Sequence, residues 1–152
     1  MIFQRINRSN PEKIFVVAMN SYSTAAITNG QYVPWDVLTD SDGVSVTGPL
    51  ARTLGGGFDA AGIVASSSIS VGDYGLIQVY GYHSAVRVRS FTIGIPAIAK
   101  GTPLYANIAG SVFCLENAVT HQTGLRVWPC AIALAANSSW TTLAKAAFIK
   151  CL

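Results

Sequence analysis

Few side chains in this sequence are suited to catalysis or metal binding. His83 and His121 are the only histidines, and neither stands at a metal-ligand spacing from a cysteine or a carboxylate. The cysteines, Cys114, Cys130 and Cys151, are an odd set without a CxxC pair, and each lies among apolar residues. This pattern is typical of buried thiols in a reducing compartment. The sequence therefore predicts no metal site and no cofactor.

The acidic residues fit turns better than a calcium site. Asp36 and the segment DSDG at 40–43 come nearest to a calcium-binding loop. An EF-hand would need an aspartate at position 38 and a glutamate at position 49, where this chain has leucine and proline. Asp and Ser bond their own backbone in turns and glycine supplies the left-handed position, so we predict a β-turn at 40–43.

Asp73 and His83 are the remaining candidates for a small enzymatic site. Asp73 lies in the segment GDYG at 72–75, where turn chemistry is the simpler interpretation, and His83 lies within a strand pattern. No serine or cysteine nucleophile stands at a suitable spacing from a histidine, and the motifs GxSxG, HExxH and GxxxxGK[ST] are absent. We therefore predict that the chain is not an enzyme and keep this site as a minor alternative.

Three tryptophans allow a second kind of binding chemistry. Trp35, Trp128 and Trp140 could stack on sugar rings, as in a carbohydrate-binding β module. Tryptophan is also a common anchor of cores and protein interfaces, and this interpretation is favoured here.

The composition points to a surface that is covered in the functional state. Charged residues make up 11% of the 152 residues, against about 25% in a typical soluble domain, and the mean hydropathy is +0.41. A chain this apolar collapses, which excludes disorder. The longest apolar stretch, 129–136, is far below the ~20 residues of a membrane-spanning helix, and the N-terminus lacks the apolar region of a signal peptide. We expect exposed apolar patches that copies of the chain or a partner would cover.

The net charge of +3 is spread along the chain. Residues 1–13 carry +2, residues 14–83 carry −4 and residues 84–152 carry +5. Nucleic-acid binders gather basic residues on one face and interleave aromatic residues, so no specific nucleic acid is predicted as a ligand. The opposite charges of the two longer parts suit head-to-tail contact between copies, and equally suit a solvated surface.

Short strands separated by turn signals predict a mainly β fold, a small β-barrel or a β-sandwich-like domain with long loops. The first strands are expected at 14–19, 31–38 and 44–46, with Pro34 at a sheet edge or a bulge. The glycine-rich segment 48–62 is expected to be a flexible loop, followed by a strand at 63–65.

The clearest strand pattern covers Leu76–Val88. Its odd-numbered positions begin apolar and end charged, while its even-numbered positions become apolar, so we predict a bend or bulge near Gly81. A hairpin is expected from 104–107 and 112–115 with its tip at Gly110, and a strand at 127–135. The final segment, 141–152, alternates like a strand, although its alanines make a short helix the competing interpretation.

Several of these segments together form a familiar pattern. The segment AAGIVASSSISVGDYGLIQVYGYHSAVRV at 60–88 runs from a G-I-V strand through a polar connection to GDYGLIQVYG and alternating valines. GTPLY at 101–105, CAIALAANSS at 130–139 and the closing AAFIKCL follow downstream, and MNSYSTAAITNGQYVPWDVLTDSDGVSV lies upstream. Over about residues 14–152 this arrangement resembles the small capsid decoration (cement) proteins of tailed bacteriophages. Where those proteins often have glycine before the Ala-rich strand, this chain has Trp128-Pro129-Cys130.

The resemblance implies a single β-rich domain at 14–152 that sits in the virion on the outer surface of an icosahedral head, after assembly in the host cytoplasm. Its partners would be the major capsid protein, bound at junctions between capsomers, and further copies of itself in a homotrimer, with no membrane. Residues 1–13, which are basic and contain apolar side chains, would form an extended N-terminal arm that orders on binding. A minor tail or fibre-base protein is the alternative structural role. The residues expected to contact the capsid or another copy are Ile2, Phe3, Arg5, Ile6, Arg8, Trp35 and Trp128.

Overall fold

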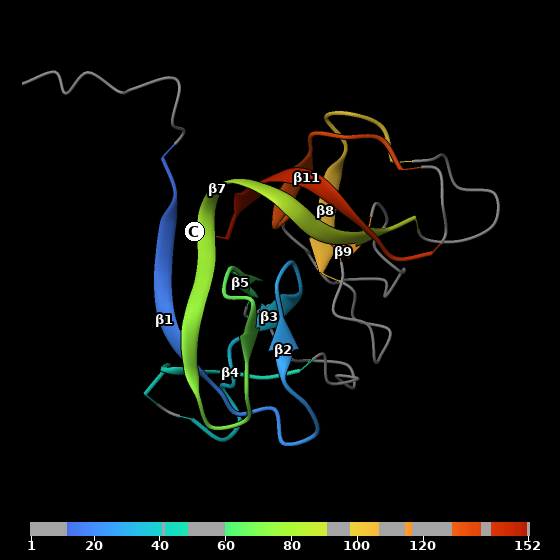
Figure 1. Cartoon of the computed structure of the whole chain (residues 1–152). Helices are drawn as coiled ribbons and strands as arrows, with labels where there is room; N and C mark the ends of the chain where they lie inside the picture. Colours follow the sequence, from blue (N-terminus) through green and yellow to red (C-terminus); the bar gives the residue numbers. More distant parts are fainter. Residues whose placement is uncertain are drawn as a thin grey trace, which may run out of the picture.

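The computed structural model describes residues 12–40, 42–48, 60–90, 98–106, 115–116, 129–137 and 141–151. Within these residues every regular element is a β-strand, so the predicted mainly β class is confirmed (Figure 1). The strands in chain order are β1 (Ile14–Asn20), β2 (Ile27–Thr28), β3 (Tyr32–Pro34), β4 (Ser45–Val46), β5 (Ala60–Val64), β6 (Ser68–Ile69), β7 (Tyr74–Arg89), β8 (Pro103–Ala106), β9 (Leu115–Glu116), β10 (Ala131–Ala133) and β11 (Leu143–Lys150).

Strand β7 is 16 residues long and joins two parts of one nine-stranded sheet, which we call the lower sheet and the upper sheet. Its first half lies between β1 and β5, and these continue to β4 and β3 to give a lower sheet in the order β4-β1-β7-β5-β3. Its second half pairs with β11 on one side and β9 on the other, in an upper sheet. Figure 1 shows β7 running beside β1 and then curving over β8 and β9.

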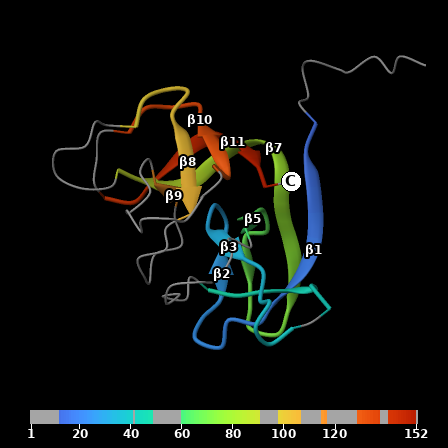
Figure 2. The same ribbon diagram turned by 180° about the vertical axis from the view of Figure 1, so that it is seen from behind.

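The upper sheet is curled, and the series of strand pairings that starts at β7 leads back to β7. β11 pairs with β7 and β10, β10 pairs with β8, β8 pairs with β9, and β9 pairs with β7. Alanines at 131, 133 and 147 face the interior of this curl, and their small side chains let the strands approach closely. The result is the half-barrel seen from behind in Figure 2, which confirms a small β domain of the predicted kind.

Two groups of buried side chains hold these sheets together. The upper core fills the half-barrel, and the lower core lies between the lower sheet and the short pair β2–β6. Burial of apolar surface in these cores is the main favourable term in folding. The upper core consists of Tyr32, Ile63, Val86, Val88, Ile98, Leu104, Leu115, Cys130, Ala131, Ala133, Ala147 and Ile149. The lower core consists of Ala18, Ile27, Val33, Val46, Ala61, Val64, Ile69 and Ile77.

The bend predicted near Gly81 is present. Gly81 has φ +101°, and a Cβ atom there would lie 2.2 Å from the carbonyl oxygen of Glu12. A second irregularity lies between Lys145 and Ala147 of β11, where the pairing with β7 shifts. Opposite this irregularity the buried face of β7 changes from the odd positions, up to His83, to the even positions, from Val86.

Gly30 brings the turn between β2 and β3 directly onto β7. Its N–H donates to the carbonyl of Val64 at 2.9 Å, and its carbonyl accepts from the N–H of Arg87 at 2.8 Å. A Cβ atom at this position would lie 1.9 Å from the carbonyl oxygen of Ala85. The upper and lower parts of the molecule are therefore joined by a backbone contact that leaves no room for a side chain.

Most other strand predictions are also confirmed. The pairing of β3 with β5 shifts between Val33 and Pro34, which is the expected proline bulge. β8 pairs antiparallel with β9 as expected for a hairpin, and its predicted tip at Gly110 lies outside the described residues. The last segment is strand β11, so the helical alternative is wrong.

The loop predicted at 48–62 ends earlier than expected, because β5 already begins at Ala60. Gly62 lies within that strand, close to the backbone of Gln78, where glycine allows the tight approach of β5 to β7. In the part of the chain described here, no helix has the length and apolar character needed to cross a bilayer.

Candidate interaction surface

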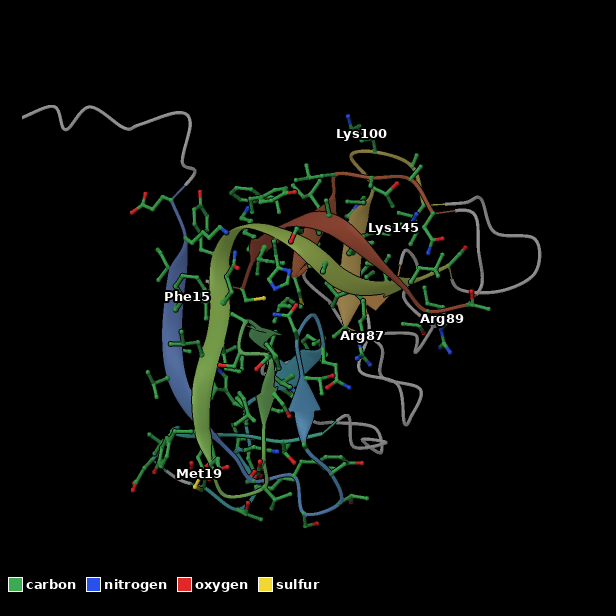
Figure 3. All side chains as sticks on the ribbon, in the orientation of Figure 1. Phe15, Met19, Arg87, Arg89, Lys100 and Lys145 are labelled. Atoms are coloured by element: carbon green, nitrogen blue, oxygen red, sulfur yellow. The ribbon has the colours of Figure 1, made fainter. Side chains whose placement is uncertain are left out.

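One face of β1 and the first half of β7 is both apolar and exposed. Register sets Val17 opposite Leu76 and Met19 opposite Tyr74, so these side chains share one face with Phe15. The exposed fraction is 60% for Val17, 63% for Tyr74, 44% for Leu76 and 41% for Phe15. Figure 3 shows Phe15 and Met19 toward opposite ends of β1. We call Phe15, Val17, Tyr74 and Leu76 the β1–β7 surface; contiguous exposed apolar side chains of this kind mark contact sites.

Strand β1 also leaves most of one edge without a strand partner among the described residues. One edge pairs with β7 along Ile14–Met19, whereas the other pairs with β4 only at Met19 and Asn20. Natural edge strands are usually protected by lysine, proline or a short length, but IFVVAMN carries no charge and no proline. An extended segment of a partner could continue the sheet here through backbone hydrogen bonds, with its side chains against the β1–β7 surface.

Aromatic and basic side chains gather beside the start of β1. The rings of Tyr80 and Phe148 meet edge to face with their centroids 5.0 Å apart. The Nζ of Lys13 lies 5.9 Å from the centroid of the Tyr82 ring, within the range of a cation–π contact. The first contact joins β7 to β11, and the second joins the residue just before β1 to β7.

The structure does not bring Asp73 and His83 together. Asp73 is exposed in the turn before β7, where its N–H donates to the carbonyl of Ser70 at 3.1 Å, while His83 is buried near the middle of β7. Ten residues of strand separate them, about 33 Å along the chain at the rise of a strand. The Nδ1 of His83 accepts from the N–H of Ala85 at 3.1 Å, so the ring is engaged by backbone.

His83 is expected to make the stability of the fold depend on pH. Burial lowers the pKa of His83, a backbone hydrogen bond with Val64 partly offsets this, and the charge of Lys13 lowers the pKa further. Below pH 6.5 the unfolded chain therefore takes up a proton before the folded chain does, and the free energy of unfolding falls as the pH drops.

Urea denaturation at pH 7.5 and at pH 5.5 measures this effect. His83→Gln should lose the part of the pH dependence that the buried ring causes, and His121→Gln should retain it. An unchanged pH dependence in His83→Gln would contradict the assignment.

Asp36 closes a turn and is not arranged for metal binding. Its carboxylate accepts from the hydroxyl of Ser21 at 2.6 Å, from the hydroxyl of Thr39 and from the N–H of Thr39 at 3.3 Å. Burial raises its pKa, but these hydrogen bonds outweigh burial and hold the pKa of Asp36 below its ordinary value. The Asp40 carboxylate accepts from the N–H of Asp42 at 2.9 Å and from the N–H of Val44 at 3.1 Å, and Gly43 has φ +68°, as the turn chemistry predicted for this segment requires. Among the described residues, no three His, Cys, Asp or Glu side chains are close enough to share a metal ion.

The interface residues predicted from the sequence are placed only in part. Trp35 is half-buried against the lower core and bridges to Val46, beside β4 and apart from the β1–β7 surface. The other predicted contacts lie outside the described residues; these are Ile2, Phe3, Arg5, Ile6, Arg8 and Trp128. Cys114, His121 and Trp140 also lie outside the described residues.

The described basic side chains of the upper sheet point in different directions. In Figure 3 Lys100 projects at the top, away from Arg87 and Arg89 below the end of β7. Arg87 donates to the hydroxyl of Thr28 at 2.8 Å, so its side chain is held within the fold.

No protein-family model and no curated protein matches the chain.

Proposed function

We propose that this chain is a non-enzymatic structural protein that decorates and stabilises an icosahedral phage head from its outer surface. It binds the major capsid protein at capsomer junctions, assembles with further copies of itself as a homotrimer, and is present in the host cytoplasm before it joins the virion. The observation that carries this proposal is the β1–β7 surface with the open edge of β1 beside it.

Three features support this role over an isolated monomer. An uncharged, exposed edge strand is an aggregation hazard unless another chain covers it. The low share of charged residues, 11%, agrees with a surface that is partly covered in the functional state. The chain also enters β1 directly from residues 1–13, so an arm that reaches a neighbouring subunit would start beside the β1–β7 surface. A protein that binds only the assembled shell stabilises it by mass action.

The first experiment counts this chain in gradient-purified virions whose genome encodes it. Quantitative mass spectrometry would compare its copy number with that of the major capsid protein. We expect a number of copies comparable to the capsid protein, because a cement protein covers the whole shell.

The other outcomes of this count are equally informative. A few copies per virion would overturn the head assignment and favour a minor tail or fibre-base protein. Complete absence would overturn the virion assignment, and a glycan array would then test a carbohydrate-binding module that uses Trp35, Trp128 or Trp140.

A further inference from the structure

Two cysteines that are far apart in the sequence meet at one end of the half-barrel. Cys130 immediately precedes β10 and Cys151 immediately follows β11, and these strands pair antiparallel with Ala131 opposite Ile149. The N–H of Lys150 donates to the carbonyl of Cys130 at 2.8 Å. The strand pairing therefore brings the two cysteines to the same end of the sheet.

Both thiols lie on the same side of that sheet. Cys130 and Ala131 are consecutive and are both buried in the upper core, so the chain does not alternate faces at this point. Cys151 is half-buried and packs against the same core. Its Sγ lies 3.5 Å from the carbonyl oxygen of Cys130, and the two side chains hydrogen-bond to each other.

We propose that Cys130 and Cys151 form a redox-active dithiol, which a small peroxide oxidises to a disulfide between β10 and the C-terminal end of β11. The described chain holds both cysteines as thiols. The Cys151 Sγ already lies 3.5 Å from the backbone of Cys130, so an S–S bond of about 2.05 Å needs a local closing movement and no change of strand pairing.

The oxidation balances with hydrogen peroxide as the oxidant. Cys130 first loses its thiol proton. The thiolate then attacks one peroxide oxygen, the O–O bond breaks, and the leaving hydroxide takes up that proton, which gives water and a Cys130 sulfenic acid. The Cys151 sulfur then attacks the sulfenic sulfur, and its proton leaves with the displaced hydroxide as a second water. Two thiols are oxidised and one peroxide is reduced.

The hydrogen bond between the thiols determines which sulfur reacts first. Cys151 donates to Cys130, which lowers the pKa of Cys130, and the same hydrogen bond together with burial raises the pKa of Cys151. Cys130 therefore loses its proton more readily, as the attacking sulfur must. Cys151, which is the more exposed of the two, is placed as the resolving cysteine.

A disulfide here would fasten the last strand of the half-barrel. The two residues are 21 positions apart, and the loop between them contains β10 and β11. Closing such a loop restricts the unfolded chain and so stabilises the fold. This chemistry does not depend on the proposed capsid role and can be tested on the purified full-length chain.

The test treats the folded full-length chain with hydrogen peroxide, denatures it with an alkylating reagent present, and maps the cysteine peptides by mass spectrometry. We expect one internal disulfide that joins Cys130 to Cys151, with Cys114 alkylated. We also expect an unfolding midpoint roughly 5–10 °C above that of the reduced chain, reversed by dithiothreitol.

Matched variants make the test specific. Cys151→Ser should give no internal disulfide and no rise in the unfolding midpoint, whereas Cys114→Ser should behave like the unmodified chain. Circular dichroism of reduced Cys151→Ser checks that the variant is folded. Alkylation of all three cysteines after oxidation, or a disulfide that includes Cys114, would overturn the proposal.

Discussion

Gly30→Ala is expected to destabilise the fold by at least about 3 kcal/mol, a large part of the 5–15 kcal/mol that holds a typical domain together. The new methyl group would lie 1.9 Å from the carbonyl oxygen of Ala85. Backbone hydrogen bonds on both sides of Gly30 keep the two segments at this distance. Relief of the clash must break the hydrogen bonds that Gly30 makes with Val64 and Arg87. Guanidinium unfolding followed by tryptophan fluorescence measures the loss.

Gly72→Ala is the matched control for this prediction. Gly72 has φ +80° and Gly30 has φ +79°, so both substitutions carry the same cost of a left-handed backbone, about 1 kcal/mol. A Cβ atom at Gly72 meets no other atom within 4 Å. The difference between the two variants therefore isolates the close approach to Ala85, and equal losses would show that this approach is not tight.

Under the proposed capsid role, Val17→Lys is expected to weaken attachment to phage heads at least about 100-fold, which corresponds to roughly 2.7 kcal/mol. Val17 lies at the centre of the β1–β7 surface, between Phe15 and Met19 along the strand and opposite Leu76. A partner that covers this surface would bury an unpaired ammonium group, and such burial costs several kcal/mol. The fold itself should change by no more than about 0.5 kcal/mol, because Val17 is 60% exposed.

Co-sedimentation of the purified variant with heads that lack this protein measures the effect. Ile132→Lys is the control, since Ile132 is an exposed apolar residue on β10, in the upper sheet. Ile132→Lys should sediment with heads as the unmodified chain does. Full attachment of Val17→Lys would show that the partner binds elsewhere, and loss of attachment in Ile132→Lys alone would move the contact to the half-barrel.

The local features of this fold could be predicted from sequence because short-range rules determine them. The bend of β7 follows from the change of apolar face and from Gly81, and the turn at Asp40 follows from side-chain bonds to nearby backbone. The strand character of β11 follows from alternation, because burial of Ala147 and Ile149 on one face outweighs the helical preference of alanine. The start of β5 at Ala60 was predicted too late in the sequence, because the segment before it is rich in glycine.

The candidate surface could not be predicted in the same way. The run IFVVAM indicates a strand but does not reveal which neighbours cover it, because pairing of β1 with β7 joins residues some 60 positions apart. The absence of charge in that run was the available signal, and a run of this kind more often predicts a strand buried on both faces. The contact between Cys130 and Cys151 likewise depends on the register of β10 with β11, which no spacing rule provides.

The position of the two chain ends has a mechanical consequence. Ile14, the first residue of β1, and Lys150, the last residue of β11, both lie opposite Tyr80, on either side of β7. A tensile force between the termini would pull across the strands, so the hydrogen bonds of β1 and β11 with β7 would carry the load one after another, as in a zipper, and would not share it. We expect the isolated chain to yield at low force, and a neighbouring molecule that clamps β1 would change the direction of loading toward shear, which strands resist far better.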